Sequence, residues 1–187
     1  MHNDLPKYFT FINSFKKEHI KKLDNNIAII YRNYSNKYDK NLIIRIRNFC
    51  KKYKKKFYLA NNINLARNLN LDGAYIPSFD NSLKINYPND KKKFLKIGSA
   101  HSIREIKIKE KQGVKLIFLS SLFKNEKNKG FLGCIKFNNI SHQTTLQIIA
   151  LGGINIKNIS KLRLINAYGY ASISLFEKNY KLNKSNF

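Results

Sequence analysis

The sequence Ala150-Leu151-Gly152-Gly153-Ile154 is a short apolar run that ends in a glycine pair, and a helical pattern follows it. Glycine lacks a Cβ atom, so the two N–H groups can close on a phosphate, and the dipole of the following helix adds to the attraction. A second apolar run with two serines comes next along the chain, at Gly169-Tyr170-Ala171-Ser172-Ile173-Ser174-Leu175-Phe176. Together the two runs predict a phosphate site between neighbouring strands. A tight turn without a ligand is the alternative for the glycine pair.

Eight short apolar runs alternate with helical or loop segments along the chain, which is typical of βα units and a parallel sheet. We therefore predict a short (β/α)8 TIM barrel, with the glycine pair in the phosphate-binding position between strands seven and eight. The expected strands are Tyr8–Ile12, Ile27–Tyr34, Lys56–Asn61, Gly73–Pro77, Phe94–Ala100, Lys115–Leu122, Thr145–Leu151 and Gly169–Leu175.

Apolar residues recur at helical spacing between several of these strands. The pattern predicts helices at 42–50, 103–110 and 156–165. Ser102 and Glu105 form a capping box at the start of the second helix, and Asn155 is expected to cap the third. The segments 78–93 and 124–141 are expected to be mostly irregular, the latter because glycines interrupt it.

The chain has 187 residues, which is enough for one domain but short for a barrel of this type. We therefore expect a single domain over residues 1–187 with a truncated or missing final helix. No apolar run is long enough to cross a bilayer, and residues 1–7 lack a signal core, so a cytoplasmic location is expected. Cys50 and Cys134 stand far apart without a motif and are interpreted as reduced thiols.

The formal net charge is +25, which raises the possibility of a nucleic-acid partner. However, 30 of the 36 basic residues are Lys and only 6 are Arg, whereas readout of phosphates and bases favours Arg. Joint enrichment of Lys, Asn and Ile is what AT-rich coding produces. We therefore interpret the basic residues, including the run from Lys51 to Lys56, as a solvated surface, and a nucleic-acid partner is not favoured.

From about Ile27 to Phe176 the chain resembles the thiamine phosphate synthase/TenI family. The resemblance depends on motifs that occur in the family's order. They are Arg32 at the end of strand two; Asn64-Leu65-Ala66-Arg67 leading to Asp72-Gly73-Ala74-Tyr75-Ile76-Pro77-Ser78-Phe79-Asp80; Ile97-Gly98-Ser99-Ala100-His101-Ser102; and the glycine pair with its partner strand.

This resemblance implies a transferase that joins hydroxymethylpyrimidine diphosphate to thiazole phosphate in thiamine biosynthesis. Pyrophosphate leaves, with Mg²⁺ neutralising its charge. By match to the family's motifs, Gly152, Gly153 and Ser174 would bind the substrate phosphate. The catalytic and metal positions that match are Arg32 facing the diphosphate, Ser99 near the pyrimidine, and Asp80 as one metal-binding aspartate.

Other positions depart from the family pattern. Asn61 stands where the family has a second metal carboxylate, and Tyr34 stands where it has a diphosphate lysine. Lys127 or Lys129 falls near the cation of the strand-six loop, whose threonines are missing. The histidine of the TenI-type tautomerases is replaced by serine, at Ser120-Ser121.

Because of these departures the sequence leaves three functions open. The first is thiamine phosphate synthase, and the alternative is a catalytically degenerate TenI-like protein that binds a phosphorylated heterocycle. The third is a basic protein associated with nucleic acid. Single residues also have structural interpretations: Arg32 in an ion pair, Asp80 in a solvated turn, and His101 as a hydrogen-bonded corner residue. The oligomeric state is not indicated.

Overall fold

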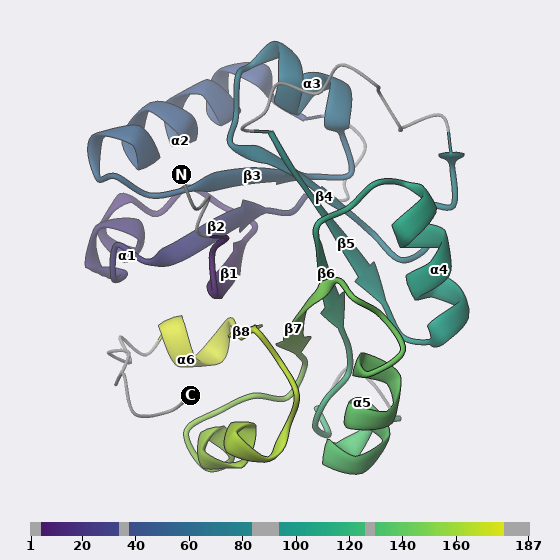
Figure 1. Cartoon of the computed structure of the whole chain (residues 1–187). Helices are drawn as coiled ribbons and strands as arrows, with labels where there is room; N and C mark the ends of the chain where they lie inside the picture. The colour runs from purple at the N-terminus through teal and green to yellow at the C-terminus, as the bar shows by residue number, and fades with distance from the viewer. Residues whose placement is uncertain (1–4, 34–37, 84–93, 126–129, 178–187) are drawn as a thin grey trace.

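The computed structural model describes residues 5–33, 38–83, 94–125 and 130–177. Eight parallel strands close into a barrel in the order of the chain, with β8 paired to β1 (Figure 1). The predicted TIM-barrel fold is therefore confirmed. The strands are β1 (Tyr8–Ile12), β2 (Ile27–Tyr31), β3 (Phe57–Ala60), β4 (Gly73–Ile76), β5 (Leu95–Ala100), β6 (Leu116–Leu119), β7 (Gln147–Leu151) and β8 (Gly169–Ala171).

Helices surround the barrel, with α2 and α3 on one side of it and α4 and α5 on another (Figure 1). Their bounds are α1 (Lys17–Lys22), α2 (Lys40–Lys52), α3 (Ile63–Asn68), α4 (Ile103–Lys111), α5 (Gly133–Ser141), the 3₁₀ helix η2 (Ile159–Leu164) and α6 (Ser174–Glu177). Across the described residues, every helix is too short or too polar to span a bilayer.

Three sequence-based expectations about secondary structure were wrong. Residues 133–141 form α5, because Phe137, Ile140 and Ser141 share one buried face despite the glycine at the start of the helix. Residues 159–164 form a 3₁₀ helix, and Asn155 instead accepts the N–H of Lys157 in a turn before it. The last strand ends at Ala171, so Ser174 begins α6.

The barrel interior is filled mainly by aromatic rings. Inward-facing positions alternate along each strand, and five of them hold Phe9, Phe11, Tyr58, Tyr75 and Phe118. Ring centroids lie 5.3 Å apart for Phe11–Tyr75, 5.5 Å for Tyr75–Phe118 and 5.9 Å for Phe11–Phe118, all in edge-to-face contacts. Such contacts stabilise beyond the area they bury. The three rings therefore form the floor on which any ligand at this end of the barrel would lie.

Helix α2 shows how the sequence pattern becomes structure. Asp39 caps it by accepting the N–H groups of Asn41 and Leu42, and Ile43, Ile46 and Cys50 are buried at helical spacing. Burial raises the pKa of the Cys50 thiol to about 12, the leading cause being loss of solvation. Cys50 is therefore a protonated core residue. Cys50 and Cys134 are both free thiols.

Candidate functional site

Parallel strands in a barrel all end at the same rim, so the residues that follow them meet there. Arg32 follows β2, Asn61 follows β3, and Asp80 lies in the loop after β4. Ser99 lies near the end of β5, and the glycine pair follows β7. The fold therefore brings the predicted residues to the mouth formed by the carboxyl ends of the strands.

A cavity of about 320 Å³ at this mouth contains both predicted metal positions. It is lined by Asn61, Asn62, Ile63, Asn64, Tyr75, Ile76 and Asp80. Asn61 has a left-handed backbone with φ of 56°, and its N–H donates to the Tyr75 carbonyl over 2.9 Å. The Oδ1 atom of Asp80 accepts the Ser82 N–H over 3.0 Å. Arg32, Ser99 and the glycine pair are outside the described lining of this cavity.

A buried lysine holds the loop that carries Asp80. Lys109 on α4 has no exposed surface, and its Nζ donates to the Asp80 carbonyl over 2.6 Å and to Gln112 Oε1 over 2.9 Å. Gln112 Nε2 donates to the carbonyls of Asp80 and Ser82. Gly98 on β5 provides space for the Lys109 side chain, because a Cβ atom at position 98 would lie 3.1 Å from it. Sequence reasoning missed Lys109, which looks like an ordinary solvent-facing helix residue.

We expect this lysine to make stability rise with alkaline pH. Burial lowers the pKa of Lys109 from 10.5 to about 8 in the folded protein. Between those values the folded state loses the proton while the unfolded chain keeps it, so the free energy of unfolding increases by about 3 kcal/mol. Denaturant titrations between pH 7.5 and 10.5, roughly the range bounded by the two pKa values, measure this increase in the free energy of unfolding. Lys109→Met should show a smaller rise, and an equal rise in both proteins contradicts the assignment.

Arg32 lies over the aromatic floor of the mouth. Its guanidinium carbon is 4.6 Å from the centroid of the Phe11 ring, a cation–π contact. Phe11 touches Tyr75, which also lines the cavity with Asn61 and Asp80. Arg32 and the cavity therefore share one contiguous aromatic support.

Ser99 is buried with 4% of its surface exposed. It lies two residues after the inward-facing Ile97 on β5, so its side chain belongs to the same barrel interior. His101, just beyond, has its N–H and Nδ1 within 2.8 and 2.9 Å of Glu105 Oε2. This geometry supports the interpretation of His101 as a corner residue, while Ser102 caps α4 by accepting the Glu105 N–H.

The glycine pair after β7 adopts backbone angles that favour glycine. Gly152 has φ of 98° and Gly153 has φ of 70°. A Cβ atom on Gly153 would lie 2.5 Å from the Phe123 carbonyl oxygen, and one on Gly152 would overlap Ser121. The loop after β6 therefore packs directly against both glycines. Within the described residues, neither glycine N–H donates to a protein acceptor.

Two serines that follow β8 bind the loop that carries the glycine pair. Ser172 Oγ donates to the Ile154 carbonyl over 2.9 Å and accepts the Leu175 N–H over 3.3 Å, which caps α6. Ser174 Oγ lies 3.4 Å from the same carbonyl. Sequence analysis selected Ser174 by family match, whereas Ser172 holds the two loops together. The spacing of Ser172 before a helical segment was a capping signal that could have found it.

We expect alanine at Gly153 to unfold the turn. The positive φ and the short distance to backbone oxygens should cost about 2 kcal/mol or more in the free energy of unfolding. Gly130→Ala is the matched control, because open space surrounds that position. Chemical denaturation of both variants measures the difference. Equal stability of the two variants would mean that the glycine pair is not required by packing.

Some predicted positions lie outside the described residues. These are Tyr34 and both candidate lysines of the strand-six loop, Lys127 and Lys129. In the described part of the chain, no three His, Cys, Asp or Glu side chains gather in one place. Any cation at the mouth would therefore rely on Asp80, neutral oxygens and its ligand.

Comparison with known proteins identifies similar sequences. A sequence model of the thiamine monophosphate synthase family matches residues 21–176. The protein named "Putative thiamine-phosphate synthase 2" from Aquifex aeolicus is 33% identical over 119 residues, covering 60% of this chain and 61% of its own length. The thiamine-phosphate synthase of Methanococcus vannielii is 26% identical over 121 residues, covering 63% and 58%. The matched region thus spans about three fifths of each curated relative.

A solved structure confirms the fold. Thiamine phosphate pyrophosphorylase from Pyrococcus furiosus superposes with a TM-score of 0.75 and covers 94% of this chain and 92% of its own. Its sequence identity is 18%, so this similarity concerns the fold alone. The structural comparison therefore agrees with the barrel fold, whereas the family follows from the sequence match over residues 21–176.

Proposed function

Because the chain belongs to the thiamine monophosphate synthase family, we propose that it joins a hydroxymethylpyrimidine diphosphate to a thiazole phosphate and releases pyrophosphate. The observation that carries this proposal is the family match over residues 21–176. The mouth of the barrel supports it, since the Asn61–Asp80 cavity lies at the same rim as two glycine amides that have no acceptor among the described residues. The small phosphorylated substrates of this reaction fit the expected cytoplasmic location.

Each group at the mouth has a role in this reaction. The amides of Gly152 and Gly153, with Ser174, would hold the thiazole phosphate, as a monoester dianion suits backbone donors. Arg32 would face the pyrimidine diphosphate from above Phe11 and stabilise the charge that develops on the leaving group. The carbon–oxygen bond to pyrophosphate breaks with its electron pair on oxygen, and the thiazole nitrogen then forms the new bond to that carbon. Catalysis here is mainly positioning and charge neutralisation.

Magnesium fits the cavity in a limited way. Asp80 would hold the ion with help from the Asn61 amide oxygen, and Mg²⁺ commonly uses one or two carboxylates plus substrate phosphate oxygens. When bound, the ion neutralises the departing pyrophosphate. With one carboxylate in the cavity, its affinity would depend on the substrate diphosphate.

A second function has an observation in its favour. The neutral Asn61 leaves the cavity with Asp80 as its single acidic side chain, while the glycine pair retains its free amides. This combination favours a protein that binds a phosphorylated heterocycle without turning it over. The two functions differ in one measurable respect, the formation of thiamine phosphate from both substrates.

We expect Asn61→Asp to strengthen the metal site. Aspartate tolerates the left-handed backbone of this position, and it adds a second carboxylate beside Asp80. If the protein is a synthase, Asn61→Asp should raise thiamine phosphate formation at low Mg²⁺ by about tenfold or more, as one charge-stabilising group can contribute ~10²–10³. Asp80→Asn should lower it by a similar factor. A coupled assay of product at several Mg²⁺ concentrations measures both.

The assay also separates the two functions. Product from the natural protein supports the synthase. No product from any variant, with calorimetric binding of thiazole phosphate, supports the binding protein. The absence of both product and binding would overturn the proposal. Asn64 lines the same cavity, so Asn64→Asp is the control for added charge. Equal gains in product formation from the substitutions at positions 61 and 64 would argue against a specific metal site.

We expect Arg32→Gln to weaken diphosphate binding selectively. The substitution removes the cation over Phe11 and leaves a shorter, polar and uncharged side chain. The Kd for the pyrimidine diphosphate should rise about tenfold or more, since hydrogen bonds to charged groups contribute ~1.5–3 kcal/mol. The Kd for thiazole phosphate should stay within a factor of about two. Equal weakening for both ligands would contradict the assigned position of Arg32.

A further inference from the structure

A second cavity lies at the opposite end of the barrel, where strands β3 and β4 begin. It has a volume of about 640 Å³ and is enclosed by the end of α2, the connection to β3, and the connection from α3 to β4. Its lining residues are Arg47, Asn48, Lys51, Lys54, Lys55, Lys56, Phe57, Asn70, Leu71 and Asp72. Nothing in the proposed reaction uses this end of the barrel.

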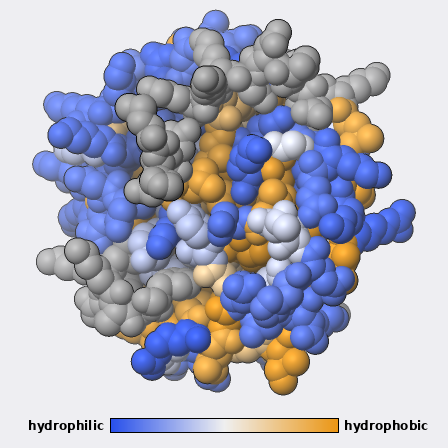
Figure 2. Space-filling view, viewed as in Figure 1, coloured by the Kyte–Doolittle hydropathy of each residue, from blue (hydrophilic) through white to orange (hydrophobic). Residues whose placement is uncertain are grey.

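The cavity concentrates positive charge well beyond the average of the chain. Lys and Arg make up 36 of 187 residues, about one in five, but 5 of the 10 lining residues. Asp72 is the single acidic lining residue, so the formal charge of the lining is +4 (five cations less one carboxylate). A uniform, composition-driven surface predicts about two cations here. Hydrophilic residues also cover the side of the molecule where α1 and α2 lie (Figure 2).

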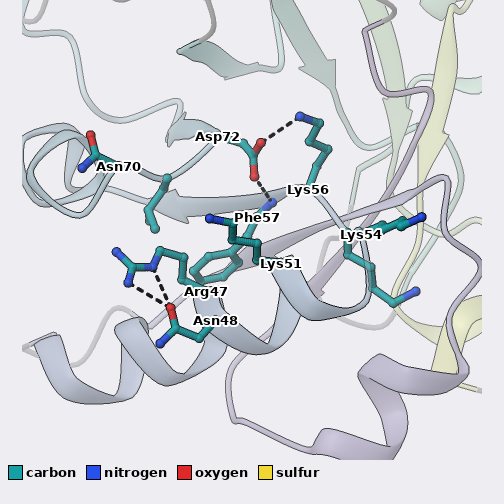
Figure 3. Close-up of a pocket in the computed structure, with 10 residues that line it drawn as sticks. Arg47, Asn48, Lys51, Lys54, Lys56, Phe57, Asn70 and Asp72 are labelled. Atoms are coloured by element: carbon teal, nitrogen blue, oxygen red, sulfur yellow. Dashed lines mark hydrogen bonds and ion pairs between the residues drawn. The ribbon is translucent and has the colours of Figure 1, made fainter.

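Some of these cations have hydrogen-bond or ion-pair partners within the protein. Asp72 Oδ1 pairs with Lys56 at 2.9 Å, and its Oδ2 accepts the Phe57 N–H (Figure 3). Lys55 is buried, and its Nζ donates to the Leu23 carbonyl over 2.5 Å. The carboxylate is therefore fully engaged within the protein.

The two exposed lysines at the end of α2 are different. Among the described residues, Lys51 and Lys54 have no side-chain hydrogen bond or ion-pair partner. Arg47 reaches toward the same space and donates to the Leu69 carbonyl and Asn48 Oδ1 (Figure 3). Both lysines line the cavity, and no carboxylate of the described residues pairs with either, so an anion in the cavity would meet uncompensated positive charge.

The backbone gives a second reason to assign a role to Lys54. Its φ is 53°, in the left-handed region just after a helix end, where glycine is strongly favoured. A lysine at this position is strained relative to glycine. The lysine side chain therefore occupies a position whose backbone conformation favours glycine.

We propose that this cavity binds a small polyphosphate anion through Lys51, Lys54 and the flanking cations. The volume suits a small ligand. The aromatic lining residue, Phe57, is 1% exposed, so the described lining offers no stacking platform for nucleic-acid bases. These features favour a compact, multiply charged phosphate over single-stranded RNA or DNA.

Calorimetric titration of the whole protein with inorganic tripolyphosphate tests the proposal. The site variant is Lys51→Gln with Lys54→Gly, and the glycine should leave the melting temperature unchanged or higher. The control is Lys17→Gln with Lys22→Gln, two exposed lysines of α1 with the same loss of charge. We expect affinity to fall about tenfold or more in the site variant, since charged hydrogen bonds are lost, and by less than about twofold in the control.

Three results would overturn the proposal. The first is absence of binding to the natural protein at low salt. The second is an equal loss in the control, which would assign binding to diffuse charge. Loss in Arg32→Gln alone would likewise overturn it, because it would assign binding to the mouth. The third is binding of a single-stranded RNA oligonucleotide, lost in the site variant, without binding of tripolyphosphate. None of these outcomes depends on synthase activity, so the two proposals can fail separately.

Discussion

The edge-to-face packing of aromatic rings inside the barrel is the interaction on which the functional end of this molecule depends. Phe11, Tyr75 and Phe118 come from three different strands and contact one another in pairs. They close the interior just below the mouth. Arg32 lies on the first ring, and Tyr75 forms part of the wall of the Asn61–Asp80 cavity. Loss of this floor would disturb both features together.

The glycine pair illustrates how packing and ligand binding can require the same residues. The loop after β6 approaches so closely that a side chain at Gly153 would meet backbone carbonyl oxygens. This close packing is sufficient to require glycine at both positions, whether or not the turn binds a ligand. The two amides nevertheless have no acceptor among the described residues, and the serines after β8 bind the carbonyl of Ile154, the residue that follows the glycine pair. A turn required for packing thus carries two amides without an acceptor among the described residues.

Much of the barrel could be predicted from sequence because buried parallel strands are short apolar runs of a recognisable length. The bounds of β1 agree with the prediction at both ends, whereas β8 ends early because Ser172 caps a helix. The rim positions of Arg32, Asn61 and Asp80 follow from strand order alone. The buried Lys109 could not be predicted, since its burial depends on the space left by Gly98 on a neighbouring strand. The Lys51–Lys56 run was interpreted as solvated surface, and only the fold shows that it encloses a cavity.

The central claim is that the main-chain amides of the glycine pair bind a phosphate monoester at the mouth. Two-dimensional ¹H–¹⁵N NMR during titration with thiazole phosphate tests it most directly, with the unphosphorylated thiazole alcohol as the comparison. The account predicts that the Gly152 and Gly153 resonances shift downfield with the phosphate and stay in place with the alcohol. Resonances that stay in place with both compounds, or move equally with both, would contradict it.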